Sequence, residues 1–334
     1  MTRDVRDRLG IEHAVVQAGL GGGLARAELA TAVSLAGGLG TVGILPDPAA
    51  FRAELDAAIG RAEGKPVAAN LLFPVLRSGH VEACVAARVP VVALFFGFDR
   101  RVVEALHAAG SFVFHQVGTA EQARRALADG ADGLIAQGQG AGGHLLATQT
   151  LAEFLPKLRE LAGARPVLAA GGIHDGASAS SALSQGADGV SVGTRFLLTN
   201  ESHAHEAYKA RLLAAEQTLV TLLFGLGWHG LHRVVPNRAT ERWCARDELG
   251  PPWVRFVNRS TQPLAKLLPA TRIRGMVRRQ NLGMPLYTPA ALVRGMDAEL
   301  ADVTPLYAGQ CVARIDVLKA AADVVREIAA GLGV

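Results

Sequence analysis

Three glycine-rich segments carry the residues that could do chemistry: Gln137–His144 (QGQGAGGH), Ala169–Ile173 (AAGGI) and Gly193–Phe196 (GTRF). Each follows a short apolar run typical of a β-strand. Glycines at strand ends let main-chain N–H groups approach an anion closely, because no Cβ stands in the way. The imidazole of His144 ends the first segment. The pattern predicts a cofactor phosphate site with a candidate acid/base beside it.

Short β-rich runs alternate with Ala/Leu-rich helical stretches, which is typical of parallel βα units. The expected strands are 14–17, 40–44, 67–71, 91–95, 112–115, 133–136, 167–169 and 190–192. The expected helices are 25–36, 48–63, 79–87, 99–109, 120–129, 151–161, 176–185 and 204–216. Asp47-Pro48, and Thr119 with Gln122, are helix start signals.

Eight such units predict an α/β fold of the (β/α)₈ TIM-barrel type over residues 11–216, with an open doubly wound sheet as the alternative. The last two glycine-rich segments then follow strands 7 and 8, whose loops usually hold phosphate in barrels. Residues 217–334 lose this periodicity, and we expect them to form a helical cap on the barrel mouth. Within it, 289–300 and 308–328 look helical.

Composition excludes several classes of protein. Half of the 334 residues are apolar, 19% are charged and the net charge is +4, so a large core is expected. Arginines are scattered apart from Arg272–Arg279, which argues against nucleic-acid binding. Three separated cysteines, no signal-peptide pattern and no apolar run of about 18 residues predict a cytoplasmic protein without a membrane span.

The residues expected at the barrel mouth are polar but nearly uncharged. They comprise amides, glycines and the imidazoles of His115 and His144, without Asp/Glu pairs or Lys. This argues against metal-assisted, Schiff-base and glycosidase chemistry, which need charged groups there. We therefore expect no metal. Amides instead suit the edge of a neutral heterocycle such as flavin. A later His-rich stretch resembles metal-ligand spacing but is interpreted as cap surface: His203, His205, His229 and His232.

Six motifs in order now resemble the nitronate monooxygenase family, formerly 2-nitropropane dioxygenases, related to NADH:quinone reductases and flavin-type enoyl-ACP reductases. They are Gln17-Ala-Gly, Ala36-Gly-Gly-Leu-Gly40, Asn70-Leu, Gln137–His144, Ala169–Ile173 and Gly193–Ser202, with a fainter Tyr307–Gln310. The resemblance implies FMN at the barrel mouth and oxidation of alkyl nitronates with O₂ to a carbonyl compound and nitrite.

The resemblance also implies residue roles. Main-chain N–H groups of Gly171, Gly172, Gly193 and Thr194 would hold the phosphate. Asn70, Gln116 and Gln137 would contact the isoalloxazine or ribityl chain, Ala18 and Gly19 would lie along a ring edge, and Gly142 and Gly143 would complete the cofactor site. His144 would be the catalytic base or would orient the substrate, with a pKa near the ordinary 6.5.

The chain departs from the family at Gly140, where Glu is common, at Leu20, often Met, and at Gln116, which is Lys in some relatives. Two alternatives to nitronate oxidation stay open. One is an NAD(P)H-dependent FMN reductase acting on quinones or enoyl thioesters, and the other is a flavin-binding protein without turnover. The expected partners are a small-molecule substrate and O₂, with NAD(P)H under the first alternative, and a second copy of the chain in a homodimer.

Overall fold

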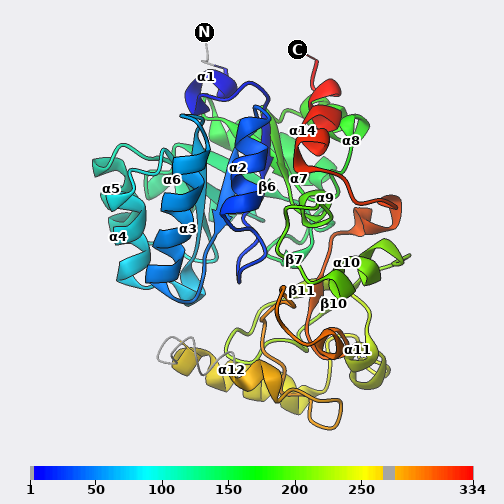
Figure 1. Cartoon of the computed structure of the whole chain (residues 1–334). Helices are drawn as coiled ribbons and strands as arrows, with labels where there is room; N and C mark the ends of the chain where they lie inside the picture. The colour runs from blue at the N-terminus through cyan, green and yellow to red at the C-terminus, as the bar shows by residue number, and fades with distance from the viewer. Residues whose placement is uncertain (1–3, 266–274, 334) are drawn as a thin grey trace.

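This computed structural model describes residues 4–265 and 275–333 (Figure 1). In them, eight parallel strands form one sheet in the order β1-β9-β8-β6-β5-β4-β3-β2. Their bounds are β1 Val15–Gln17, β2 Gly40–Gly43, β3 Val67–Leu72, β4 Val91–Phe95, β5 Phe112–Val117, β6 Gly133–Gln137, β8 Val167–Ala170 and β9 Gly189–Val192. The amide of Gln17 donates to Leu39 O, and that of Leu39 to Val15 O, both at 2.9 Å. These bonds join β1 to the residue before β2, so the expected barrel is confirmed and the open sheet is not formed.

Helices follow the strands on the outside of the barrel. After the short α1 (Val5–Leu9) they are α2 Ala27–Leu35, α3 Pro48–Arg61, α4 Ser78–Ala86, α5 Arg100–Ala108, α6 Ala120–Ala128, α7 Leu151–Ala162 and α8 Gly176–Ser184. Both predicted start signals are confirmed. The Asp47 side chain accepts from Ala49 N before α3, and that of Thr119 accepts from Gln122 N before α6.

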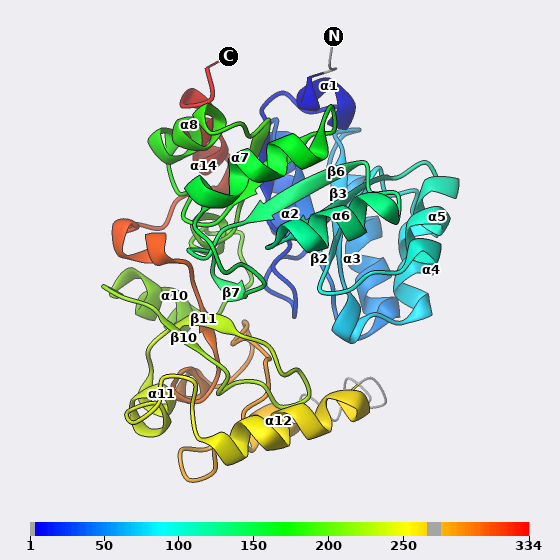
Figure 2. The same cartoon turned by 180° about the vertical axis from the view of Figure 1, so that it is seen from behind.

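The last barrel helix comes from the far end of the chain. We expected it at 204–216, where α10 (Glu206–Leu213) instead packs on the 3₁₀ turns η2 (Ala298–Asp302) and η3 (Gln310–Arg314). Helix α14 (Ala321–Ala330) contacts α2 and α8 (Figures 1 and 2). Its residues Val324, Val325 and Ile328 are buried. The expected boundary at 216/217 stays a prediction.

The segment between α10 and α14 lies beside the carboxyl ends of the strands (Figure 1). It holds β10 (Leu219–Thr221), β11 (His232–Val235), α11 (Arg238–Trp243), α12 (Pro252–Ala265) and β12 (Leu306–Tyr307). The prediction of continuous helices over 289–300 and 308–328 is wrong. In these ranges only the 3₁₀ turns η2 and η3 and the helix α14 are helical. Gly295 has φ +84°, and Val293 and Lys319 form isolated β-bridges with Ala204 and Thr199. Tertiary pairing therefore overrides helical composition in both ranges.

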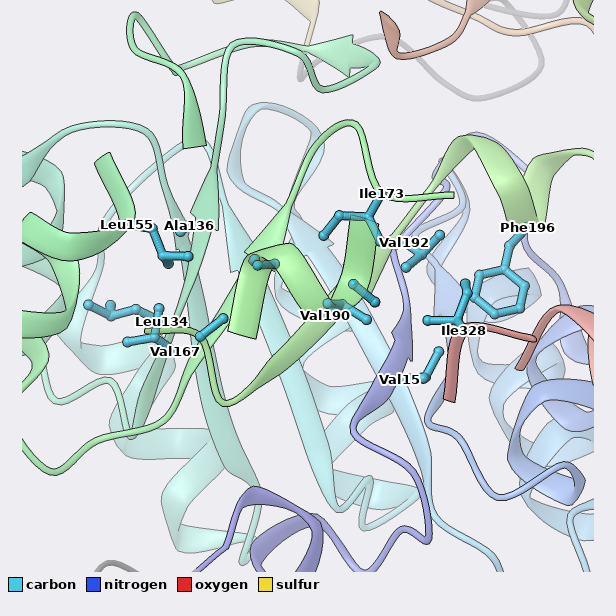
Figure 3. Close-up of a cluster of buried hydrophobic side chains, with 14 of the residues drawn as sticks. Val15, Leu134, Ala136, Leu155, Val167, Ile173, Val190, Val192, Phe196 and Ile328 are labelled. Carbon is cyan, nitrogen blue, oxygen red and sulfur yellow. The ribbon is translucent and has the colours of Figure 1, made fainter. Parts of the chain in front are cut away.

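Apolar side chains fill the space between the strands and the helices outside them. Figure 3 shows two parts of one buried cluster: Leu134 and Val167 lie beside Leu155 of α7, and Val15 lies beside Ile328 of α14. Residues 272–274 of the basic run Arg272–Arg279 lie outside the described residues. Among the residues that are described, no helix is long and apolar enough to cross a membrane.

Candidate active site

One cavity of about 880 Å³ lies at the carboxyl ends of the barrel strands, and later segments of the chain form its outer wall. Parallel strands of a barrel direct their carboxyl ends to one face, so residues far apart in sequence meet there. All twelve residues predicted for the site line this cavity: Ala18, Gly19, Asn70, Gln116, Gln137, Gly142, Gly143, His144, Gly171, Gly172, Gly193 and Thr194. The structure brings them together, and their roles stay predictions.

The glycines after β8 and β9 leave main chain open to the cavity. Gly171 and Gly172 have φ +115° and +79°, a region that side chains rarely adopt. A Cβ at Gly172 would meet no atom within 4 Å, and at Gly193 the nearest atoms would be 3.8 Å away. The backbone at both positions therefore faces free space, as a cradle for an anion requires.

Two other predicted glycines serve close packing instead. A Cβ at Gly142 would lie 2.4 Å from the main chain of Ala308 and Gly309. A Cβ at Gly19 would lie 2.2 Å from Asn70 Cβ. Gly142 thus lets the C-terminal segment reach the barrel loop, and Gly19 makes room for the Asn70 side chain.

The faint motif Tyr307–Gln310 explains the departure at Gly140. Gln310 N donates to Gly140 O at 3.0 Å, and a Cβ at Gly140 would lie 3.0 Å from Gln310 Oε1. Gln310 therefore occupies the space beside position 140. Gly309 N donates to Thr194 Oγ1 at 2.9 Å, and the Thr194 hydroxyl also hydrogen-bonds to the Cys311 side chain. A ligand oxygen would therefore compete with Cys311 for the hydroxyl hydrogen.

The three predicted amide side chains differ in the hydrogen-bonding atoms that remain available to a ligand. Asn70 Nδ2 donates to Ala93 O at 3.1 Å, while its Oδ1 is buried without a partner. Both polar atoms of Gln137 already have a partner: Nε2 donates to His144 O at 2.9 Å, and Oε1 accepts from Leu146 N at 2.7 Å. Gln116 lines the cavity. Asn70 and Gln116 can therefore serve a ligand, whereas Gln137 braces the loop of His144.

His144 sits in an aromatic cluster rather than in a polar one. It belongs to β7 (Gly143–His144), which pairs with β11 so that His144 lies opposite His232. The Trp228 ring stacks on the imidazole at a centroid distance of 3.7 Å and an interplanar angle of 11°. Tyr307, His232 and Phe96 follow at 5.4, 5.6 and 5.9 Å.

This environment changes the titration expected of His144. Burial lowers the pKa of its imidazole well below 6.5, and the nearby His232 lowers it further. Its Nε2 is buried without a hydrogen-bond partner. The expectation of an ordinary pKa near 6.5 is therefore wrong. At neutral pH the ring is uncharged and is a weak base.

The sequence did not predict which rings would pack around His144. His232, interpreted as surface, has 0% of its area exposed, and Phe96 has the positive φ of +64°, unusual for an aromatic residue. His115 lies buried between the Phe73 and Phe98 rings, with interplanar angles of 14° and 12°. Among the described residues, no three His, Cys, Asp or Glu side chains are grouped to hold a metal.

Comparison with known proteins gives three kinds of similarity. The family model of nitronate monooxygenase matches residues 46–331. The Pseudomonas aeruginosa nitronate monooxygenase is 34% identical over 283 residues, covering 69% of this chain and 78% of that protein. Nitroalkane oxidase from Streptomyces ansochromogenes has a similar structure, with TM-score 0.75, 26% identity and coverage of 99% and 98%.

A further relative carries a different activity in its name. It is the (3aS,4S,5R,7aS)-5-hydroxy-7a-methyl-1-oxo-octahydro-1H-indene-4-carboxyl-CoA dehydrogenase of Mycobacterium tuberculosis, 39% identical over 220 residues. The match covers 64% of this chain and 61% of that protein, so the chain spans less than two thirds of this relative.

Proposed function

Because this chain belongs to the nitronate monooxygenase family, a family of flavin-dependent oxidoreductases, we propose that it uses FMN to oxidise alkyl nitronates. The products with O₂ would be a carbonyl compound and nitrite. The observation that carries this proposal is the meeting of an open glycine cradle, the partnerless Oδ1 of Asn70 and His144 on one cavity.

The residues of the cavity fit FMN. The exposed main chain at Gly171, Gly172 and Gly193, with the Thr194 hydroxyl, suits a phosphate dianion. Asn70 Oδ1, buried without a partner, needs a donor such as a ribityl hydroxyl or ring N–H. Gln116 would hydrogen-bond to the ring, beside Ala18 and Gly19. FMN, when bound, supplies the electron-accepting centre.

His144 would act on the substrate side of the cavity. An uncharged imidazole can donate one hydrogen bond to the nitronate oxygens, which orients the anion. It can also accept a proton from a neutral nitroalkane, although its lowered pKa makes it a weak base for that step. Orientation of preformed nitronate is therefore its main proposed role.

A second candidate is the NAD(P)H-dependent reductase acting on quinones or enoyl thioesters. The Mycobacterium tuberculosis relative whose name specifies a CoA thioester favours it. The cavity of about 880 Å³ would have to hold FMN together with the substrate. Apolar side chains line the outer part of the cavity: Ile44, Leu45, Leu72, Val75, Leu226, Met276, Val277, Val293 and Met296.

Anaerobic mixing separates the candidates. The purified protein should be yellow and should release FMN, not FAD, on denaturation, because we find one phosphate cradle in the described residues. Propane 2-nitronate should then bleach the flavin absorbance, and bubbling with O₂ should restore it with release of nitrite. Bleaching by NADH or NADPH alone would favour the reductase. Bleaching by neither would support a flavin-binding protein without turnover.

The cytoplasmic location and the homodimer also stay proposals. Sedimentation of the FMN-bound protein over a range of concentrations would test the homodimer.

A further inference from the structure

Trp228 covers one face of His144. The two rings are nearly parallel at a centroid distance of 3.7 Å, and both residues line the cavity. Only 6% of the Trp228 surface is exposed. The indole therefore lies in the wall of the site, directly on the imidazole that faces substrate.

His144 lacks the usual means of orienting a functional imidazole. In most sites one ring nitrogen is held by a carboxylate or a carbonyl oxygen, which fixes the ring for its task. Here Nε2 is buried without a partner. Pairing of β7 with β11 and the hydrogen bond from Gln137 Nε2 to His144 O hold the backbone of His144, but neither contact sets the plane of its ring. Ring contacts must do the orienting.

We propose that Trp228 is the positioning residue of this site, holding the plane of the His144 ring by stacking where a hydrogen bond would normally do so. This inference rests on the proposed function in so far as it assigns His144 to the substrate. A flat stack fixes the ring plane and excludes water from one face. The imidazole then meets the substrate by its edge.

The indole is itself held by the loop between β10 and β11. His232 Nε2 accepts from Phe224 N at 3.3 Å, so Nδ1 carries the proton and lies 2.9 Å from Gly230 O. His232 thus joins both ends of the loop that carries Trp228. A Cβ at Gly230 would lie 3.2 Å from Trp228 Nε1, which makes glycine the best fit there. Phe96 meets the indole edge-on at 5.2 Å.

The rings that face His144 come from four segments and carry no charge at neutral pH. Besides Trp228 and Phe96 they are His232, whose pKa burial lowers to about 4, and Tyr307, whose pKa burial raises. Removing the indole would admit water to the imidazole without adding or removing a charge. Any change in His144 titration would then report the loss of the stack.

The test compares Trp228→Leu, which removes the aromatic ring, with Trp228→Phe, which keeps one. Trp253→Ala on α12 is the matched control, since Trp253 is 47% exposed. Nitrogen-15 NMR of the histidine rings follows His144 against pH in the FMN-bound protein, with its signal assigned through His144→Gln. Turnover of preformed nitronate gives kcat and KM separately.

In Trp228→Leu we expect His144 to titrate closer to pH 6.5 than in the wild type. We also expect kcat to fall roughly 10- to 100-fold, with a smaller change in KM, because misorientation acts on the reacting geometry. The pKa of His144 and the kcat of Trp228→Phe should lie between those of the wild type and Trp228→Leu. Both values in Trp253→Ala should match the wild type. If Trp228→Leu does not fold, the change in the pKa of His144 in Trp228→Phe tests the proposal instead.

An unchanged His144 spectrum and titration in a folded Trp228 variant would overturn the inference. The NMR readout is independent of the reaction. A changed His144 titration in a protein that turns over no nitronate would therefore support the positioning role while removing the proposed function.

Discussion

At the scale of single residues, the site combines open backbone with a shielded imidazole. Gly172 has φ +79° and free space where a Cβ would point, whereas His144 is packed among aromatic rings with a lowered pKa. The first feature suits binding of an anionic group, and the second keeps a neutral hydrogen-bonding ring beside it. Each can be changed separately from the other.

Replacing Gly172 should test the phosphate cradle. Asp and Asn both tolerate positive φ, so Gly172→Asp and Gly172→Asn differ mainly in charge. A carboxylate about 5 Å from a phosphate costs ~3 kcal/mol per unit charge at an effective dielectric constant near 20. We expect Gly172→Asp to bind FMN at least about 100-fold more weakly than Gly172→Asn, measured by flavin fluorescence titration. Equal affinities would place the phosphate elsewhere.

Replacing His144 should separate proton transfer from orientation. We expect His144→Ala to retain FMN and to lose kcat/KM with both substrate forms. The loss should be greater with neutral nitroalkane, because only this form needs a base. The difference should be smaller than the ~10²–10⁴-fold typical of general base catalysis, because the lowered pKa makes His144 a weak base. Since the pKa of His144 is lowered, wild-type kcat/KM with nitronate should show no acid limb near pH 6.5. Equal losses with both forms would assign His144 to orientation alone.

At the scale of elements, two contacts between distant segments determine how the site is built and how the ring of helices is completed. The short β7 pairs with β11, which places His144 against the segment that carries Trp228. Helix α14 returns from the end of the chain to contact α2 and α8. A Cβ on its last-turn glycine, Gly331, would overlap Gly176 O at the start of α8, so the two helices meet closely.

Shortening a buried side chain of α14 should destabilise the barrel. Ile328 is fully buried, and an Ile-to-Ala change in a core typically costs 2–5 kcal/mol. We expect Ile328→Ala to lower the free energy of unfolding by about this amount in urea, with FMN released in the same transition. The control is Arg326→Ala, an exposed site on the same helix. Equal stabilities of the two variants would contradict the packing of α14 on the barrel.

At the scale of the whole molecule, burial of neutral histidines ties stability to pH. Burial lowers the pKa values of His115 and His232 to about 4 and lowers that of His144 as well. In the unfolded chain these groups take up protons near pH 6.5, so the unfolded state gains protons first as pH falls. Stability is fully present above pH 6.5 and decreases toward pH 4.

The size of this effect can be measured at one residue. Each histidine with such a shift should contribute a slope of about 1.4 kcal/mol per pH unit between its two pKa values. His115→Phe keeps a ring between Phe73 and Phe98 but cannot titrate. We expect urea unfolding between pH 6.5 and 5 to show a slope lower by about that amount in His115→Phe than in the wild type. Identical slopes would show that His115 has the same pKa in the folded and unfolded states, which contradicts the effect of burial.

The sequence by itself determined the barrel and twelve of the residues that line its cavity. Strand alternation and helix periodicity are local patterns, and they placed the eight strands and the glycines, Asn70 and Gln116 that follow them. Once the barrel is inferred, its topology brings all strand ends to one face. The predicted site residues therefore meet in the structure although they are distant in sequence.

Only the tertiary structure decided how His144 is held and which helix completes the barrel. Trp228 stacks on His144, and α14 takes the place expected for residues 204–216. Both depend on contacts between distant segments, and a two-residue strand such as β7 has too few residues to show a period. The lowered pKa of His144 follows from the same cause, because burial is produced by neighbours that no local pattern specifies.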